Sequence, residues 1–462
     1  MIMKTEKVLI DSILQLFSIG QYNNALTEAK YATQKFGQSP VLWNILGACR
    51  ANLKQMDEAI KCYKKAIQID SQYGAAHNNL GNAFKHLGKP TEAKISYEKA
   101  IQVNPNLSEP YFNLGVISQD NFDMDNALDL YERALSLKPD YVEALNNLGN
   151  IHREEGRLEQ SISVFKKALD LEPNSAVANN NLGLVYRDQG QIKEAIDFFN
   201  KATSLRPDYA EAYSNLGNCE KKRGKVKEAV INYEKALKLD PQNGLARHFC
   251  AALKGENTKT APRDYVEGLF DKFAVNFEGS LLKELDYKIA DFSDIVMRNR
   301  TSKSLGSVLD LGCGTGLLGA HLRKFTDTLV GVDLSKSMLR IAENKKIYNK
   351  LIHGDLIDYL SLEELDFDYF VAADVFIYVG DLYDVFRLIK ERNKKNGTFA
   401  FSTEYTDKER FILEQSGRYS HSKTYIEDLG EEFGFHLSHF SKSELRKQEG
   451  NFLTGGNYIF EF

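Results

Sequence analysis

Apolar residues recur with a helical period along the first half of the chain. Within each stretch of 34 residues they fall at i, i+3, i+4 and i+7, and then again at i, i+4 and i+7. This spacing predicts two amphipathic helices per stretch. The pattern predicts seven units, at residues 6–39, 40–73, 74–107, 108–141, 142–175, 176–209 and 210–243. One further amphipathic stretch, Leu245–Leu253, predicts a helix that caps the stack.

Individual positions repeat at the same spacing. A glycine column comprises Gly47, Gly81, Gly115, Gly149, Gly183 and Gly217, and an aromatic column comprises Tyr63, Tyr97, Tyr131, Phe165, Phe199 and Tyr233. Glycine lets helices approach closely, and the rings fill the space between units. Prolines such as Pro105 and Pro139 lie at unit ends, where they stop the second helix.

These units resemble the tetratricopeptide repeat, a helix–turn–helix of this length. Trp43-Asn44-Ile45-Leu46-Gly47 is similar to the opening of that repeat. The resemblance covers about half of the chain, and the first unit is degenerate. It implies an all-α tetratricopeptide solenoid over residues 6–254.

Asparagines form a further column on the first helix of five successive units. They are Asn79, Asn113, Asn147, Asn181 and Asn215. In tetratricopeptide arrays this face lines a concave groove, and a similar ladder in the O-linked N-acetylglucosamine transferase array grips extended peptides. Amides suit a peptide because each offers a donor and an acceptor. The column therefore predicts a protein or peptide partner; the alternative is a consensus copied by duplication. Basic residues nearby, such as Lys85 and Lys221, alternate with acidic ones.

The pattern changes after the repeats. Residues 255–262 are polar and contain chain breakers, which predicts a linker. Residues 263–462 then alternate helical segments, expected first at Tyr265–Phe277 and Leu281–Met297, with short apolar strands. The expected strands are Ser307–Leu311, Leu329–Asp333, Leu351–Gly354, Tyr369–Asp374, Thr398–Thr403, Phe435–Ser441 and Asn457–Phe462. This order predicts a multidomain chain whose second domain is a doubly wound, Rossmann-like α/β fold.

The first predicted strand runs into a glycine-rich loop, Asp310-Leu311-Gly312-Cys313-Gly314-Thr315-Gly316. The glycines also fit the dinucleotide pattern G-x-G-x-x-G. However, the carboxylate of Asp310 would repel a pyrophosphate and suits an ammonium group. Asp355 places another carboxylate after the third strand, near an adenine position. The ligand thus has an amino acid at one end and adenosine at the other, as S-adenosyl-L-methionine does and NAD does not.

The domain resembles class I S-adenosylmethionine-dependent methyltransferases over its whole length. The resemblance implies a seven-stranded sheet with the last strand inserted antiparallel, and S-adenosyl-L-homocysteine as product. It assigns the methionine part to Asp310, Gly312, Gly314 and Gly316, the ribose to Asp333 and the adenine to Asp355. The expected cofactor-binding set is Asp310, Gly312, Cys313, Gly314, Gly316, Asp333, Leu334, Asp355, Leu356 and Asp374. For Asp355 and Asp374 the alternative role is a helix N-cap.

The sequence indicates less about the methyl acceptor than about the cofactor. Methyl transfer mainly needs alignment of the acceptor and uses a base only for some acceptors. The expected catalytic residues are Tyr378, Glu404 and His421, with Asp381, Tyr419 and Tyr425 as further candidates. His421 is a candidate general base, and its alternative is a structural histidine. Phe270, Phe273 and Phe277 form either a lid, as in methyltransferases that esterify carrier-bound acids, or ordinary core.

Composition excludes several classes of protein. The net charge of −5 argues against nucleic-acid binding. Five scattered cysteines without metal spacing predict a reducing compartment, hence the cytoplasm, and no metal. No apolar run approaches the about 20 residues that a membrane span needs.

The whole combination, including Gly380-Asp381-Leu382 and Gly417–Ser422, resembles bacterial tetratricopeptide-containing predicted methyltransferases. Three hypotheses follow. The first is a methyltransferase whose array recruits a protein or peptide, in one version the acceptor itself. The second is an O-methyltransferase for a small or carrier-bound molecule, with the array as an anchor. The third is a scaffold with a relic domain, against which the intact loop and acidic residues argue.

Overall fold

A computed structural model of the chain describes residues 5–274, 277–279, 289–300, 302–362, 364–448 and 451–462. The chain divides into two compact units, residues 1–205 and 206–462. The seventh repeat and the helix after it therefore group with the α/β domain. No described helix is both long enough and apolar enough to cross a membrane.

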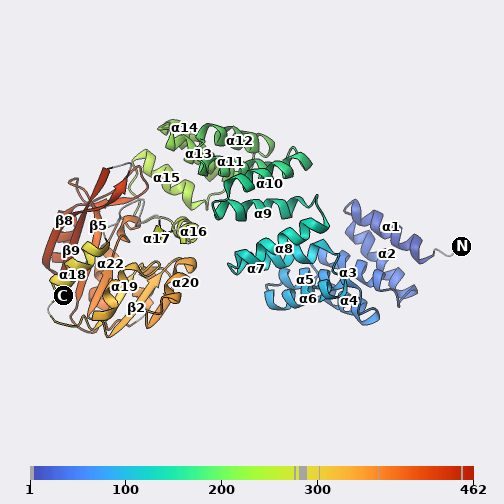
Figure 1. Cartoon of the computed structure of the whole chain (residues 1–462), viewed down its shortest axis with the longest axis horizontal. Helices are drawn as coiled ribbons and strands as arrows, with labels where there is room; N and C mark the ends of the chain where they lie inside the picture. Colours follow the sequence, from blue (N-terminus) through green and yellow to red (C-terminus); the bar gives the residue numbers. More distant parts are fainter. Residues whose placement is uncertain (1–4, 275–276, 280–288, 301, 363, 449–450) are drawn as a thin grey trace. The chain divides into compact units, whose positions relative to one another are not determined.

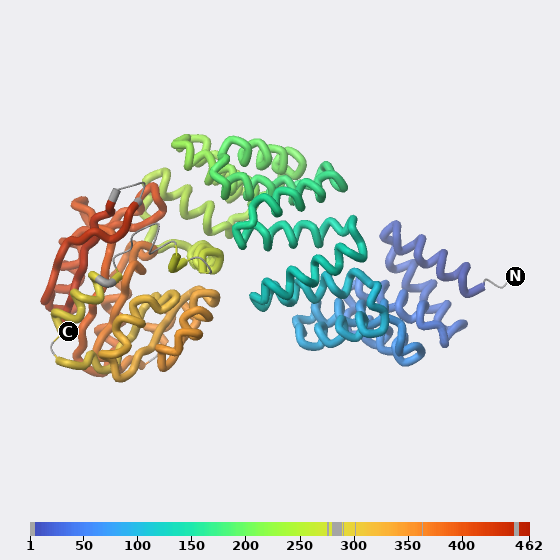
Figure 2. Tube along the Cα trace, in the orientation of Figure 1, coloured from blue at the N-terminus to red at the C-terminus, as the bar shows by residue number. Residues whose placement is uncertain are grey.

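The first unit consists of antiparallel helix pairs, each pair packed on the next (Figures 1 and 2). Its helices are α1 (Glu6–Ser18), α2 (Tyr22–Lys35), α3 (Pro40–Asn52), α4 (Met56–Ile69), α5 (Gly74–His86), α6 (Pro90–Val103), α7 (Ser108–Asp120), α8 (Met124–Leu137), α9 (Val142–Glu154), α10 (Leu158–Leu171), α11 (Ala176–Asp188) and α12 (Ile192–Leu205). Each pair coincides with one predicted unit, which confirms the repeat register. Ala93, Tyr97, Leu114 and Ile117 form one of the small cores between neighbouring pairs.

The second unit begins with the last repeat. Its helices are α13 (Ala210–Lys222), α14 (Val226–Leu239), α15 (Gly244–Lys254), α16 (Arg263–Phe273), α17 (Phe277–Gly279), α18 (Ile289–Arg298), α19 (Leu317–Leu322), α20 (Lys336–Asn344), α21 (Leu356–Leu362), α22 (Tyr383–Arg392) and α23 (Lys423–Phe433), with 3₁₀ turns η3 (Arg323–Phe325) and η4 (Phe376–Tyr378). α15 is the predicted capping helix. The first part of the helix expected at Leu281–Met297 lies outside the described residues.

The second unit is built around one mixed sheet. Its strands are β1 (Ser307–Leu311), β2 (Thr328–Asp333), β3 (Lys350–His353), β4 (Tyr369–Ala372), β5 (Thr398–Tyr405), β6 (Phe411–Leu413), β7 (Tyr419–His421), β8 (His436–Gln448) and β9 (Asn451–Glu461). Parallel strands follow the order β3-β2-β1-β4-β5. The last strand, β9, pairs antiparallel with both β5 and β8, as predicted. The hairpin β6–β7, which continues from β5, is the addition to the predicted seven strands.

Helices cover both faces of this sheet, because its central strands present mostly apolar side chains on both faces. On one face α21, α22 and α23 contribute Leu360, Phe386 and Ile426 to the larger core. On the other face α18 and α19 contribute Phe292 and Leu322 to a second core. Figure 1 shows α19, α20 and α22 flanking the strands.

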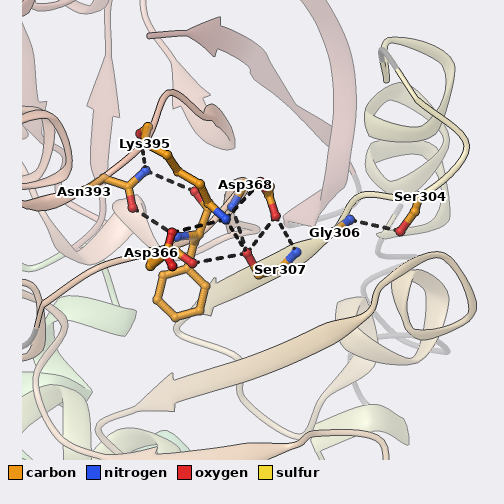
Figure 3. A network of polar contacts seen from close by, with 8 residues as sticks. Ser304, Gly306, Ser307, Asp366, Asp368, Asn393 and Lys395 are labelled. Atoms are coloured by element: carbon orange, nitrogen blue, oxygen red, sulfur yellow. Dashed lines mark hydrogen bonds and ion pairs between the residues drawn. The ribbon is translucent and has the colours of Figure 1, made fainter.

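A polar cluster joins the amino ends of β1 and β4 (Figure 3). Asp368 accepts hydrogen bonds from the backbone N–H of Ser307 at 2.8 Å and from its hydroxyl at 2.7 Å. The ammonium of Lys395 lies 3.0 Å from Asp368 and 3.2 Å from Asp366. These hydrogen bonds and ion pairs therefore stabilise the amino end of the sheet. A cavity lies at its carboxyl end.

Candidate active site

A cavity of about 410 Å³ lies at the carboxyl ends of β1, β2 and β4. Of the residues predicted to bind a cofactor, Asp310, Gly312, Cys313, Gly314, Asp333, Leu334, Asp355, Leu356 and Asp374 line it. Tyr378 lines it as well. Among the described lining residues Gly316, Glu404 and His421 do not appear. The cavity therefore brings together most of the predicted site and separates three residues from it.

The glycine-rich loop after β1 needs its glycines for backbone geometry. Gly312 has φ +65° and Gly314 has φ +53°, values that L side chains rarely adopt. A Cβ on Gly312 would also lie 2.5 Å from Cγ2 of Val375. Gly316, with φ +83°, is the N-cap residue of α19. It lies where the loop enters α19 and is not among the described residues that line the cavity.

Asp310 is a buried carboxylate at the end of β1. Its Oδ2 accepts a hydrogen bond of 2.7 Å from the hydroxyl of Tyr348. Burial raises the pKa of Asp310 to about 7; the Tyr348 bond opposes that rise, and the charge of Asp333 adds to it. A cation in the cavity would favour the ionised form of this carboxyl group.

Asp333, at the end of β2, holds the glycine loop in place. Its Oδ2 accepts from the backbone N–H of Gly314 at 2.7 Å, and its Oδ1 accepts from that of Ser335 at 2.8 Å. Burial raises the pKa of Asp333 despite these bonds. Each oxygen retains a further lone pair for a donor in the cavity.

Asp355 has both roles considered from the sequence. It lines the cavity, and its Oδ1 caps α21 by accepting from the N–H of Ile357 at 2.9 Å. Its Oδ2 lies 3.1 Å from Nε of Arg263, the first residue of α16. Arg263 also donates to both oxygens of Asp358, at 2.6 and 2.9 Å. Arg263 thus joins α16 to the adenine end of the predicted site.

A buried ion group closes the other end of the cavity. The guanidinium of Arg446, which is 2% exposed, donates to Asp374 and to Glu404. Asp374 has φ +58°, and its Oδ1 has no hydrogen-bond partner among the described residues. Glu404 is therefore a partner of Arg446 rather than a member of the cavity wall. Burial raises the pKa of Glu404, and the positive charge of Arg446 opposes this rise.

Arg446 and Arg418 both line the cavity, and sequence reasoning missed them. Arg446 lies in β8 at an irregular register between Glu444 and Lys447. Arg418 lies in the turn of the β6–β7 hairpin, 3.7 Å from Glu404. Only the crowding of polar groups around residue 418 pointed to this end of the cavity.

The interpretation of His421 as a general base needs correction. The imidazole is completely buried, and its Nε2 lies 3.0 and 2.9 Å from the carbonyl oxygens of Val379 and Gly380. Two carbonyl acceptors require that Nε2 carry the hydrogen and donate it. Burial lowers the pKa of His421 to about 4. This histidine is neutral and joins β7 to the segment after β4.

Aromatic side chains form another part of the cavity wall. Phe270, Phe273 and Phe277 line the cavity, and the ring of Phe270 meets that of Tyr378 edge to face at 5.3 Å. Burial raises the pKa of the Tyr378 hydroxyl.

The remaining candidates for the acceptor side bond to the protein itself. Tyr425 donates to Asp381 at 3.0 Å, and Tyr419 bonds to the hydroxyl of Thr258. Neither tyrosine is among the described residues that line the cavity.

The segment predicted as a linker forms hydrogen bonds with two parts of the α/β domain. Asn257 accepts from the N–H of Leu413 at 2.8 Å and donates to the carbonyl of Phe411 at 3.1 Å. Ala261 donates to the carbonyl of Tyr378 at 2.9 Å. Thr260, Ala261 and Arg263 also line the cavity. This segment is thus a wall of the cavity, which the polar composition did not indicate.

The asparagine column lies partly or fully buried between repeats. Asn79 donates to Asn44 of the preceding repeat at 3.0 Å. Asn113 donates to Asn78 at 3.3 Å and to Asn82 at 3.1 Å, again in the preceding repeat. Asn147 donates to the Tyr131 hydroxyl at 3.1 Å, and Asn181 and Asn215 are buried. At least three of these amides thus join neighbouring repeats, and the peptide-binding role of the column stays a prediction.

Comparison with known families gives two matches. The family described as the cilia and flagella-associated protein 70 C-terminal domain, a tetratricopeptide family, matches residues 14–255. The family described as a methyltransferase domain matches residues 302–441.

Two curated relatives are methyltransferases. An uncharacterized methyltransferase of Schizosaccharomyces pombe is 30% identical over 112 residues, 22% of this chain and 39% of that protein. The dTDP-3-amino-3,6-dideoxy-alpha-D-glucopyranose N,N-dimethyltransferase of Streptomyces fradiae is 36% identical over 77 residues, 17% of this chain and 29% of that protein. The chain thus spans well under half the length of either relative.

Among solved structures, the APC/C hetero-tetramer Cut9–Hcn1 is 20% identical with a TM-score of 0.47, covering 53% of this chain and 48% of that one. YrrB, a TPR protein with an unusual peptide-binding site, is 21% identical with a TM-score of 0.35, covering 41% of this chain and 97% of that one.

Proposed function

We propose a function from two premises: the chain belongs, through residues 14–255, to the cilia and flagella-associated protein 70 C-terminal domain family, and it carries a methyltransferase domain. The chain is an S-adenosylmethionine-dependent methyltransferase whose array binds a protein or peptide. The observation that carries the proposal is the cavity, where the carboxyl groups of Asp310, Asp333 and Asp355 share one wall with the glycine loop.

The lining residues fit this cofactor in charge and in shape. Asp310 is buried with a pKa raised to about 7, so an ammonium group beside it would relieve the cost of its charge. Asp333 and Asp355 would hold the ribose hydroxyls and the adenine amine. Gly312 and Gly314 place backbone without side chains in the cavity wall, where the methionine part of the cofactor would lie. When bound, S-adenosylmethionine supplies an activated methyl group on a sulfonium.

The chain itself then has to orient the acceptor and exclude water. Phe270, Phe273 and Tyr378 provide an apolar wall beside the glycine loop. A fixed wall serves transfer because alignment contributes most to such a reaction. The buried and neutral His421 takes no part in proton transfer.

The array contributes to the same function through its last repeat and capping helix. His248 of α15 donates from Nε2 to the carbonyl of Gly417 at 2.7 Å, next to the cavity residue Arg418. A partner held by the array would thus be recruited to an array end that contacts the cavity wall. This favours a protein or peptide that presents the acceptor over a separate small molecule.

Calorimetry on the full chain tests the cofactor assignment. We expect S-adenosylmethionine and S-adenosylhomocysteine to bind at one site, and NADH not to bind. Binding of NADH without binding of either sulfur compound would overturn the assignment. Transfer of labelled methyl groups into the protein fraction of a lysate, rather than its small-molecule fraction, would support the role given to the array.

A further inference from the structure

Tyr348 lies in the short segment between α20 and β3 and contacts a carboxylate of the cavity wall. Its hydroxyl donates to Oδ2 of Asp310 at 2.7 Å, and Asp310 lines the cavity. Tyr348 itself is not among the described residues that line it. This tyrosine can thus act on a ligand through Asp310 without touching the ligand.

Two glycines from different elements leave the space that the side chain of Tyr348 occupies. An added Cβ on Gly319, in α19, would lie 2.3 Å from the hydroxyl oxygen of Tyr348. One on Gly331, in β2, would lie 2.9 Å from Cε1 of the same ring. Neither glycine has a positive φ, so packing rather than backbone geometry explains the absence of a side chain. Gly331 is also the direct partner of Asp310 in the pairing of β1 with β2.

The neighbouring residue holds this segment against the start of β2. Oδ1 of Asn349 accepts from the N–H of Leu329 at 2.8 Å, and the N–H of Asn349 donates to the carbonyl of Leu329 at 2.8 Å. The Tyr348 ring packs against the core that contains Leu318 and Leu322. These contacts place the hydroxyl beside Asp310 without the help of a ligand.

The surroundings of Asp310 disfavour its negative charge, and the Tyr348 hydroxyl opposes them. Burial raises the pKa of Asp310 to about 7, the Tyr348 bond lowers it, and the charge of Asp333 adds to the rise. Burial and the charge of Asp310 raise the pKa of the Tyr348 hydroxyl well above its ordinary value, so this group stays protonated. A protonated hydroxyl that donates to a carboxylate favours the ionised form, to which a cationic ligand binds.

We propose that Tyr348 is a positioning residue of the cofactor site, whose hydroxyl holds the Asp310 carboxylate oriented and ionised for the ammonium group of the cofactor. The proposal rests on the proposed function and adds to its site a residue that does not touch the ligand. Because the effect passes through Asp310, loss of the hydroxyl should weaken the binding of ligands that carry the ammonium group. Ligands that lack this group should bind as before.

Tyr348→Phe removes the hydroxyl and keeps the ring. Calorimetry on the full chain at pH 8 should show about tenfold weaker binding of S-adenosylhomocysteine, because a hydrogen bond to a charged group is lost. 5′-Methylthioadenosine, which has the adenosine and the sulfur but no amino acid, should bind with unchanged affinity. Unchanged affinity for S-adenosylhomocysteine, or an equal loss for both ligands, overturns the proposal.

Tyr405→Phe is the matched control. The hydroxyl of Tyr405 also donates to an aspartate, Asp407, at 2.7 Å, and neither residue is among the described residues that line the cavity. This variant should bind both ligands as the wild type does. Gly319→Ala is a second test, because its methyl group would displace the Tyr348 hydroxyl. It should reproduce the selective loss, and it decides the matter if Tyr348→Phe does not fold.

Stability without ligand tests the same bond independently of the proposed function. The free energy of unfolding of the wild type and of Tyr348→Phe is compared at pH 6 and at pH 8. Without the hydroxyl the folded pKa of Asp310 should be higher, so the variant should lose more stability, relative to the wild type, at pH 8 than at pH 6. Asp333 and Cys313, the other titratable groups near Asp310, are the same in both proteins.

An equal loss at both values of pH would mean that the hydroxyl serves only the fold, and it overturns the proposal. If neither ligand binds to the wild type, the proposed function fails. The comparison of stabilities then still decides whether Tyr348 keeps Asp310 ionised.

Discussion

The repeat array and the catalytic domain both depend on glycine, but for opposite reasons. In the array, Gly149 lies inside α9, and a Cβ there would be 2.7 Å from Cζ of Phe165 in the same repeat. In the loop after β1, Gly314 has φ +53°, and the atom nearest to an added Cβ would be Cε1 of Phe277 at 4.0 Å. The array therefore needs glycine for packing between helices, whereas the loop needs it for backbone geometry.

This difference separates stability from ligand binding. Contacts in the array recur in each repeat and hold helices together, so a change there should lower the free energy of unfolding. Under the proposed function the polar groups at the cavity bind a ligand, so a change there should lower affinity instead. Proteins commonly retain such costly groups at functional sites.

The largest effect is expected at Asp333. Asp333→Ala removes a carboxylate that would accept from two ribose hydroxyls, and a hydrogen bond to a charged group contributes about 1.5–3 kcal/mol. We expect calorimetry on the full chain to show at least tenfold weaker binding of S-adenosylhomocysteine by a variant that still folds. Asp327, which precedes the same strand at its other end, provides the control, and Asp327→Ala should bind normally. Unchanged affinity in a folded Asp333→Ala variant would place the ribose elsewhere.

The next effect is expected in the array. Gly149→Ala forces a methyl group against the buried ring of Phe165, and overpacking of this kind costs about 1–3 kcal/mol. Denaturant unfolding followed by the fluorescence of Trp43, the single tryptophan, would measure the loss. Binding of S-adenosylhomocysteine should not change.

The control for Gly149 is another helical glycine. Gly268 in α16 has nothing within 4 Å of an added Cβ. Gly268→Ala should therefore cost nothing and could gain up to about 1 kcal/mol from helix propensity. Equal effects of the two substitutions would remove the packing explanation.

The same comparison explains which parts of the fold the sequence predicts. Because the pattern repeats every 34 residues, each packing position occurs several times in the sequence. All seven helix pairs of the array can therefore be predicted from it. The central strands can be predicted as well, because each consists mostly of apolar residues. The β6–β7 hairpin escaped prediction, since its strands are three residues each and contain polar residues.

Side-chain direction accounts for the errors at the site. Arg446 lies at an irregularity in the pairing of β8 with β9, so strand alternation does not reveal that it is buried. His421 turns inward to backbone carbonyls that precede it by about 40 residues in the chain. Most of the predicted loop residues line the cavity, because spacing after a strand determines the position of a backbone. Spacing does not determine which way a side chain points.

A smaller effect is expected from pH at Asp310. Its pKa is raised to about 7 in the free protein, so the carboxyl group is mostly protonated at pH 6 and ionised at pH 8. A cationic ligand prefers the ionised form, so affinity for S-adenosylhomocysteine should fall about tenfold from pH 8 to pH 6. Calorimetry across this range would show it, and Asp310→Asn should bind weakly at both values with a flatter profile.

The stability of the protein without ligand should change with pH in the opposite direction to the affinity, falling as pH rises. Because the folded pKa of Asp310 is above the unfolded value, its contribution to stability is present below pH 4 and is lost as pH rises through 7. Asp310→Asn should therefore be more stable than the wild type at pH 8 without ligand. A less stable variant would show that Asp310 serves the fold rather than the ligand.

The smallest effect is expected at Asn113, and it tests the array side of the comparison most directly. Its amide donates to Asn78 and Asn82 of the preceding repeat, and an ordinary hydrogen bond contributes about 0.5–1.5 kcal/mol. Asn113→Ala should lower the unfolding free energy by that amount in the Trp43 fluorescence assay. Asn126 is exposed on α8, so Asn126→Ala should change it by less than about 0.5 kcal/mol. If Asn113→Ala costs nothing and a partner peptide binds more weakly, the column serves a ligand, and the array would resemble the cavity rather than contrast with it.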